Sequence, residues 1–152
     1  PMTMMTHDAH TVQVLMDDDD DIDAEAIRPS FKKARIANPL YHVPHGVAAL
    51  ERLRGEDGQP PLERPYIVLL DLNMPRMSGL EFLEAIRGSS DLNDSVVFIL
   101  TTSDDDRDKV AAYQQNVAGY MVKSKAGEDF IKLIGMLDHY WRVIEMPPSN
   151  PV

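Results

Sequence analysis

Short apolar runs, each ended by a polar residue, constrain the fold of this chain more than any other feature. Residues 66–70 are apolar throughout and are followed by Asp71, and residues 96–100 are apolar and are followed by Thr101. Such runs are typical of strands that are buried on both faces of a parallel sheet. Segments with helical spacing of apolar residues separate them, which predicts an α/β fold.

Five expected strands alternate with five expected helices along the chain. The strands are expected at residues 11–16, 39–43, 66–70, 96–100 and 118–122, and the helices at 23–37, 46–54, 79–87, 105–115 and 127–144. Pro29 lies inside the first expected helix and should kink it or shift its start. Because crossovers between parallel strands are right-handed, helices should cover both faces of one five-stranded parallel sheet.

Polar residues follow four of the five expected strands. Asp17, Asp18 and Asp19 follow the first, Asp71 the third, Thr101 the fourth and Lys123 the fifth. Ligands of open α/β sheets bind at the carboxyl ends of the strands. The sequence therefore predicts a site at this edge that contains several carboxylates, a hydroxyl and an ammonium group.

These side chains are suited to phosphoryl transfer onto a carboxylate. Clustered carboxylates repel one another, and a hard divalent cation such as Mg²⁺ relieves that repulsion. Asp71 can act as a nucleophile and form an acyl phosphate. Positive charge from the metal and from Lys123, with a hydrogen bond from Thr101, would neutralise and position the transferred group.

Composition limits the partners and the compartment. The net charge is −10, which argues against a nucleic acid as the main partner, and the chain contains no cysteine. No apolar run approaches the ~20 residues of a membrane span, so a cytoplasmic protein is expected. We expect a disordered leader at residues 1–10, one domain at 11–145, and an extended proline-rich tail at 146–152.

Four segments in order resemble the CheY-like receiver domains of response regulators. They are residues 14–19 (VLMDDD), 67–75 (IVLLDLNMP) with Ser78 and Gly79, 98–102 (FILTT) and 118–123 (AGYMVK). The intervals of 30 residues from Asp71 to Thr101 and 22 residues from Thr101 to Lys123 also fit the family. The resemblance implies a flavodoxin-like sheet of strand order 2-1-3-4-5 with helices on both faces.

The resemblance also implies roles for individual residues. Asp71 is expected to be the phosphoacceptor, and Asn73 to offer its backbone carbonyl to the metal. Thr101 is expected to bind the phosphoryl group and to move on activation, and Lys123 to pair with the phosphoryl oxygens. Tyr120 resembles the aromatic residue that changes its burial as Thr101 moves, the alternative being an ordinary packed tyrosine. The expected cofactor is Mg²⁺, with Mn²⁺ as a substitute.

The run of aspartates allows two registers for the acidic pair that would bind the metal. Counting from the first strand gives Asp17 and Asp18, whereas counting back from the apolar positions of the first helix gives Asp18 and Asp19. The second register is preferred, and it leaves Asp17 at a strand position that is usually apolar. Ser124 departs from the family pattern, because it follows Lys123 where proline is usual.

The resemblance implies a signalling protein rather than an enzyme, whose only chemistry is its own phosphorylation and dephosphorylation. The expected partners are a sensor histidine kinase and an unidentified downstream protein, since no DNA-binding domain follows residue 144. The end of the last helix, with the long loop before the third strand, resembles stand-alone regulators that are paired with phytochrome-type kinases. Tyr140 and Trp141 are candidates for a homodimer interface, and the alternative is that they pack on their own sheet.

Two other functions compete with this interpretation. A phosphohydrolase of the haloacid dehalogenase type needs a second acid two residues after the nucleophile, and Asn73 cannot serve there. A pseudo-receiver, which binds a partner without being phosphorylated, would not need the intact set of Asp71, Thr101 and Lys123.

Overall fold

The computed structural model describes residues 12–17, 39–73 and 77–122, and residues 136, 139, 140, 143, 145 and 147. The described strands are β1 (Gln13–Asp17), β2 (Leu40–Val43), β3 (Tyr66–Leu70), β4 (Val96–Thr101) and β5 (Gly119–Val122), and the described helices are α2 (Gly46–Arg54), α3 (Gly79–Arg87) and α4 (Asp106–Gln114). The expected leader, the first helix, and most of the last helix and of the tail lie outside the described residues. None of the helices in the described part of the chain has the length and hydropathy needed to cross a membrane.

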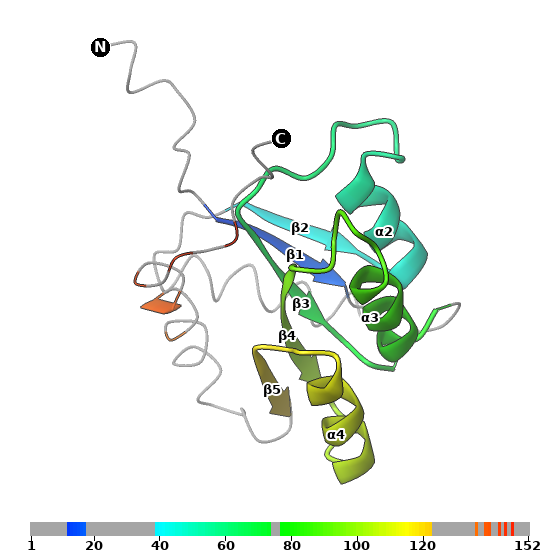
Figure 1. Ribbon diagram of the computed structural model, residues 1–152, viewed down its shortest axis with the longest axis vertical. Coiled ribbons are helices and arrows are strands. Elements are labelled where there is room, and N and C mark those ends of the chain that lie inside the picture. Colours follow the sequence, from blue (N-terminus) through cyan, green and yellow to red (C-terminus); the bar gives the residue numbers. More distant parts are fainter. Residues whose placement is uncertain are drawn as a thin grey trace.

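The five strands form one parallel sheet of order β2-β1-β3-β4-β5 (Figure 1). Every pairing between neighbouring strands is parallel, and β1 lies between β2 and β3 and pairs with both. The strand order predicted from the family resemblance is therefore confirmed. The strand order reverses between β1 and β3, so the carboxyl ends of these two strands and of β4 are the place where a ligand site is expected.

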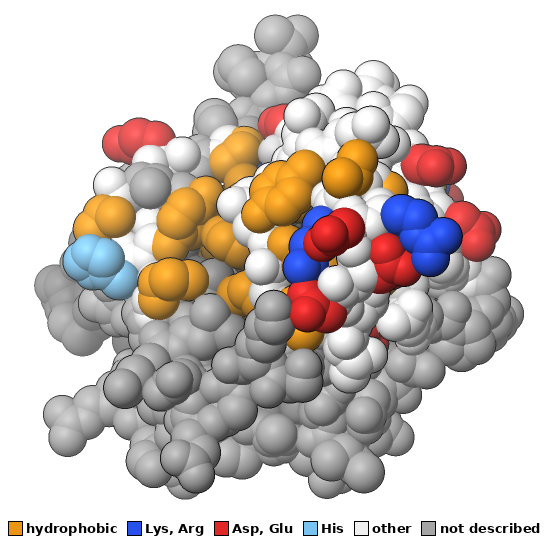
Figure 2. Space-filling model, turned by 90° about the horizontal axis from the view of Figure 1, so that it is seen from below, with side chains coloured by type: hydrophobic (Ala, Val, Ile, Leu, Met, Phe, Trp, Pro, Cys, Tyr) orange, Lys and Arg blue, Asp and Glu red, His pale blue; other side chains and the backbone are white. Residues whose placement is uncertain are grey.

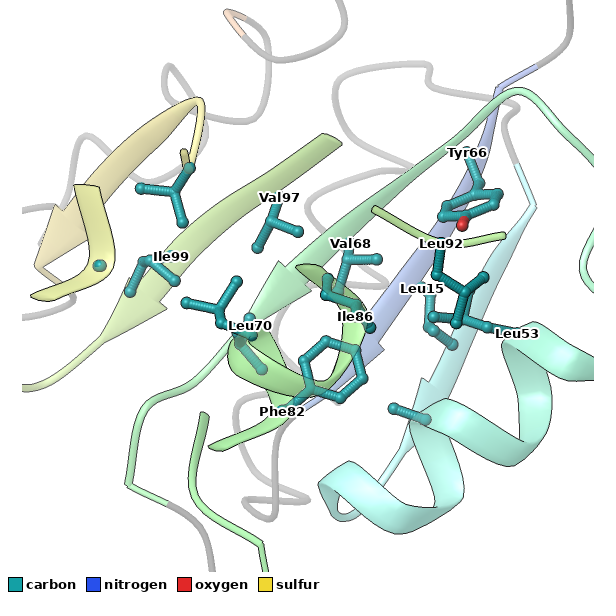
Figure 3. Packing of buried hydrophobic residues seen from close by; sticks show 14 of the residues in the cluster. Leu15, Leu53, Tyr66, Val68, Leu70, Phe82, Ile86, Leu92, Val97 and Ile99 are labelled. Carbon is teal, nitrogen blue, oxygen red and sulfur yellow. The ribbon is translucent and has the colours of Figure 1, made fainter. Parts of the chain in front are cut away.

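One face of the sheet packs against α2, α3 and α4. Phe82, Leu83 and Ile86 recur at helical spacing along α3 and are fully buried against this face. In Figure 3, Phe82 and Ile86 lie over Val68 and Leu70 of β3. This packing fixes α3 directly against β3, the strand that ends at Asp71.

The opposite face of the sheet has its own apolar cluster. Its buried members, from β1, β3 and β4 and the residue before β1, are Val12, Val14, Met16, Ile67, Leu69, Phe98 and Leu100. Tyr140 packs against this cluster, with its ring 5.1 Å from that of Phe98 and almost perpendicular to it. Edge-to-face pairs of this kind add to the stabilisation from burial.

The start of α3 is fixed by side-chain capping. The hydroxyl of Ser78 accepts a hydrogen bond from the backbone N–H of Glu81, and the side chain of Glu81 accepts one from the backbone N–H of Ser78. This capping box satisfies donors that the first turn of a helix otherwise leaves unpaired. It stabilises the end of α3 that faces the candidate site.

Candidate functional site

Asp71 and Thr101 meet at the carboxyl edge of the sheet. Asp71 follows β3 directly, and its backbone N–H donates to the carbonyl of Asp17 at the end of β1 (2.9 Å). Thr101 is the last residue of β4, and its hydroxyl donates to Oδ1 of Asp71 at 2.8 Å. Both side chains are buried, with 6% of Asp71 and none of Thr101 exposed. Residues from two neighbouring strands are thus joined by a direct hydrogen bond.

The loop after β3 provides a second donor to the same carboxylate oxygen. The backbone N–H of Asn73 donates to Oδ1 of Asp71 at 3.1 Å. A carboxylate oxygen held by two donors from different segments has a fixed orientation. Asn73 is therefore close to Asp71, as its predicted role in metal binding requires.

The amino end of α3 approaches the backbone of this loop very closely. The N–H of Gly79 donates to the carbonyl of Leu72 at 3.0 Å. A Cβ atom on Gly79 would lie 2.4 Å from the carbonyl oxygen of Asp71 and 2.7 Å from Cα of Leu72. Only glycine allows this approach, so Gly79 is a positioning residue for the loop that carries Asp71.

The loop between β4 and α4 connects Thr101 to two further elements through Ser103. The hydroxyl of Ser103 donates to Oδ2 of Asp108 in the first turn of α4 at 2.5 Å. Its backbone carbonyl accepts a hydrogen bond from the hydroxyl of Tyr120 in β5 at 2.9 Å. Burial raises the pKa of Tyr120 above its usual value, while the bond to Ser103 partly opposes that shift. Sequence reasoning missed Ser103, whose only signal was a serine placed between the end of β4 and the acidic start of α4.

Tyr120 is half-buried and packs against the apolar cluster on the α2 and α3 side of the sheet. This contact is compatible with both expectations for Tyr120, a packed tyrosine and a residue that responds to Thr101. Its hydroxyl donates to the carbonyl of Ser103, which lies two residues after Thr101 in the sequence. The change of burial on activation stays a prediction.

Asp17 lies inside β1 rather than after it. It is opposite Leu70 in the register of β1 and β3, and its side chain is fully buried. The strand was expected at residues 11–16 and is observed at Gln13–Asp17, so it includes this acid. An acid built into the strand agrees with the register in which Asp18 and Asp19 form the metal-binding pair.

The donors at this edge suit a hard divalent cation. The described part of the site contributes the carboxylate of Asp71 and the backbone of Asn73, and oxygen donors of this type are preferred by Mg²⁺ and Mn²⁺. No group of three or more potential metal ligands occurs among the residues that the structure describes. Asp18 and Asp19, the other predicted ligands, and Lys123 with its neighbour Ser124 lie outside those residues.

The two aromatic residues proposed for a dimer interface have different outcomes. Tyr140 is only partly buried, and its ring packs on Phe98 of β4 within the same chain. This contact favours the alternative in which Tyr140 packs on its own sheet. Trp141 lies outside the described residues.

Comparison with known proteins agrees with this fold. Residues 14–135 match the response regulator receiver domain. The chain belongs to this family. This receiver is similar to the response regulator Rcp1 of Synechocystis sp., with 30% identity over 128 residues that cover 84% of this chain and 87% of Rcp1. The resemblance to CheY-like receivers seen in the sequence is therefore confirmed.

Solved structures of related regulators have the same fold as this receiver. The crystal structure of the Mn²⁺-bound form of Rcp1 is similar with a TM-score of 0.77 and 28% identity, covering 90% of this chain and 99% of that chain. The bacteriophytochrome response regulator RtBRR is similar with a TM-score of 0.69 and 27% identity, covering 93% of this chain and 84% of that chain.

Proposed function

We propose that this receiver accepts a phosphoryl group on Asp71 from the phosphohistidine of a sensor histidine kinase, and that this changes a surface read by another protein. The observation that carries the proposal is the hydrogen bond of 2.8 Å from the Thr101 hydroxyl to the Asp71 carboxylate. It unites, at the carboxyl edge of a receiver fold, a carboxylate that can be phosphorylated and a hydroxyl that can bind the product.

The reaction is an in-line transfer between two nucleophiles. A carboxylate oxygen of Asp71 attacks phosphorus, a P–O bond forms, and the P–N bond to the kinase imidazole breaks. The imidazole leaves with the electron pair of that bond and takes a proton from water. The Thr101 hydroxyl then donates to a phosphoryl oxygen in place of the carboxylate, and the ammonium of Lys123 pairs with the added negative charge.

The proposed ligands of a divalent cation are the carboxylates of Asp18, Asp19 and Asp71 and the backbone carbonyl of Asn73. The metal, Mg²⁺ or its substitute Mn²⁺, supplies positive charge that offsets the charge of the phosphoryl oxygens. The hard oxygen donors at this edge support the proposal, as does the Mn²⁺-bound form of the similar regulator Rcp1. The position of Asp17 within β1 supports the choice of Asp18 and Asp19 over Asp17 and Asp18.

We further propose that the kinase is of the phytochrome type. The support is the sequence at the end of the last helix and the similarity to the bacteriophytochrome response regulator RtBRR over 93% of this chain. Phosphotransfer from a panel of purified sensor kinases would test this, with the phytochrome-type member expected to label the receiver fastest. Equal labelling by unrelated kinases would contradict this assignment but not the role of Asp71.

Intact mass spectrometry after incubation with acetyl phosphate and Mg²⁺ tests the central proposal. Wild type should gain one phosphoryl group, whereas Asp71→Asn and wild type in EDTA should gain none. Asp91→Asn is the matched control, because Asp91 is an exposed acid in the loop before β4, at the opposite edge of the sheet. It should be phosphorylated like wild type.

An absent adduct would be followed by a binding measurement with beryllofluoride, which imitates the phosphoryl group without being hydrolysed. Binding by wild type but not by Asp71→Asn would mean that the adduct forms and is lost quickly. A receiver that neither gains the group nor binds beryllofluoride would contradict the proposal. The remaining explanation would then be a pseudo-receiver that binds its partner constitutively.

A further inference from the structure

Asp17 is a buried acid to which the proposed phosphoryl transfer gives no role. It has no exposed surface, and among the described residues it is the only acid buried to this extent. Its neighbours in the ladders are Val43 of β2 and Leu70 of β3, which are both apolar. Residues two apart in a strand point to the same face, so Asp17 shares the face of Leu15, whose apolar cluster includes residues of α2 and α3. A carboxylate thus stands where the sheet is otherwise apolar.

Exposed acids of this receiver are stabilised in a different way. Figure 2, seen from the side of the molecule at which α4 lies in Figure 1, shows acidic side chains next to basic ones at the surface. Lys109, for example, pairs with Asp104 and Asp106 at the start of α4. Water and dissolved ions also screen such exposed charges. Asp17 has no exposed surface, so its charge acts more strongly on other charges nearby.

Asp17 lies directly beside the phosphoacceptor. The backbone N–H of Asp71 donates to the carbonyl of Asp17 at 2.9 Å. Neighbouring strands lie about 4.8 Å apart and each residue advances a strand by about 3.3 Å, which places the two Cα atoms about 6 Å from each other. Asp17 also directly precedes Asp18 and Asp19, the other proposed carboxylate ligands. Its charge is therefore added to that of the three carboxylates proposed to bind the cation.

We propose that the buried carboxylate of Asp17 strengthens the binding of a divalent cation at this edge through its charge, without being a ligand. A buried carboxylate is unfavourable unless opposite charges or hydrogen-bond donors compensate for its lost hydration. A divalent cation is such a charge, so its binding should in turn make the burial of Asp17 less unfavourable. The role of Asp17 rests on the proposed cation site and adds to it a positioning residue from outside the set of ligands.

Titration with Mn²⁺, in which electron paramagnetic resonance measures the free ion, tests this role directly. Asp17→Asn removes the charge and keeps the shape of the side chain. Its dissociation constant for Mn²⁺ should be about tenfold higher than that of wild type, as is usual when a residue that supports the ligands is replaced. Asp91→Asn is the matched control, because it removes one negative charge from an exposed position at the opposite edge of the sheet. It should change the constant by less than about twofold.

Asp17→Val is a second variant, which places an apolar side chain among apolar neighbours. In EDTA it should unfold at a higher urea concentration than wild type, because a buried charge is removed. Mg²⁺ should raise the urea midpoint of wild type by more than that of Asp17→Val, because stabilisation by a ligand grows with its affinity. A purely structural role of Asp17 would alter the midpoint in EDTA but not the dissociation constant for Mn²⁺. If Asp17→Asn does not fold, Asp17→Val replaces it in the Mn²⁺ titration.

Asp71→Asn separates the role of Asp17 from the cation site itself. It removes a proposed ligand and should weaken Mn²⁺ binding by more than Asp17→Asn does. Equal dissociation constants for wild type and Asp17→Asn would overturn the role of Asp17 and leave the cation site and the phosphorylation of Asp71 intact. An equally large loss of binding in the two variants would make Asp17 a ligand, contrary to the proposal. If Asp71→Asn binds Mn²⁺ as tightly as wild type, the proposed cation site is wrong, and the role of Asp17 falls with it.

Discussion

Replacing Gly79 by alanine tests whether α3 braces the loop that carries Asp71. The new Cβ would lie 2.4 Å from the carbonyl oxygen of Asp71, which is 1.0 Å inside the 3.4 Å at which ordinary contact begins. It would also lie 2.7 Å from Cα of Leu72. Both atoms belong to the backbone, so no side-chain rotation can relieve the contact. Either α3 or the loop must move away.

The expected cost follows from two opposing effects. Overpacking that displaces backbone belongs at the upper end of the usual range, about 3 kcal/mol. Alanine has a better helix propensity than glycine by up to about 1 kcal/mol, which offsets part of this cost. We therefore expect Gly79→Ala to lower the free energy of unfolding by about 2 kcal/mol, which corresponds to a fall in Tm of about 4–8 °C for a domain of this size.

Gly88→Ala is the matched control for this experiment. Gly88 follows α3 with ordinary helical dihedral angles, and its Cβ would lie 3.3 Å from the nearest atom, the carbonyl oxygen of Glu84. Urea denaturation followed by circular dichroism should place this variant within about 0.5 kcal/mol of wild type. Equal urea midpoints for the two alanine variants would refute the argument that close approach requires glycine at position 79.

Three further substitutions test other parts of the structure. Arg87→Met removes donors to four backbone carbonyls in the loops before β4 and after α4. Urea denaturation should show that the free energy of unfolding falls by about 2–3 kcal/mol, and a fall of under about 1 kcal/mol would contradict this. Burial raises the pKa of Tyr66, so the folded state keeps its proton where the unfolded state loses it, and stability should fall as the pH rises above about 10. Urea midpoints at several pH values should show a shallower alkaline fall in Tyr66→Phe, and an unchanged fall would contradict this assignment. Phe82→Ala should cost about 3–5 kcal/mol by the same assay, because the ring is fully buried, and a cost near 1 kcal/mol would mean that the core collapses around the gap.

The elements that the sequence predicted best are those with local signals at their ends. The bounds of α3 agree with the prediction at both ends, because Ser78 and Glu81 form a capping box and Gly88 follows the last turn. The bounds of α2 also agree, and Gly55 ends this helix in a left-handed conformation with φ of 75°. Local chemistry decided these boundaries, so a sequence was sufficient to find them.

The expected bounds of β1, residues 11–16, differ from the observed Gln13–Asp17 at both ends. The expected strand ended before Asp17, although the preferred register of the acidic pair left Asp17 at a strand position. The ladder with β3 continues through Asp17, since its carbonyl accepts from the N–H of Asp71. Pairing with β3 therefore extends the strand through Asp17, in agreement with that register.

Some contacts of the candidate site could be predicted from the sequence, and others could not. Asp71 and Thr101 were expected to meet because each ends a strand of one parallel sheet, and they do. The contact of Ser103 with Asp108 depends on the path of the loop between β4 and α4, for which there was no periodic signal. Sheet geometry therefore predicted the chemical groups, whereas the connection from them to α4 required coordinates.

The distribution of burial separates the parts of this receiver that hold the chemical groups from the part that can respond. β3 and the following Asp71 are buried throughout, as is all of β4 except its first residue, so the carboxylate and the hydroxyl stand on the best-packed strands of the sheet. α4 buries one alanine and is joined to those strands through the polar contacts of Ser103. Segments with few buried apolar contacts are the ones that change position at low free-energy cost. Of the described helices, α4 has the fewest buried residues, so it is the one expected to change position at the lowest free-energy cost.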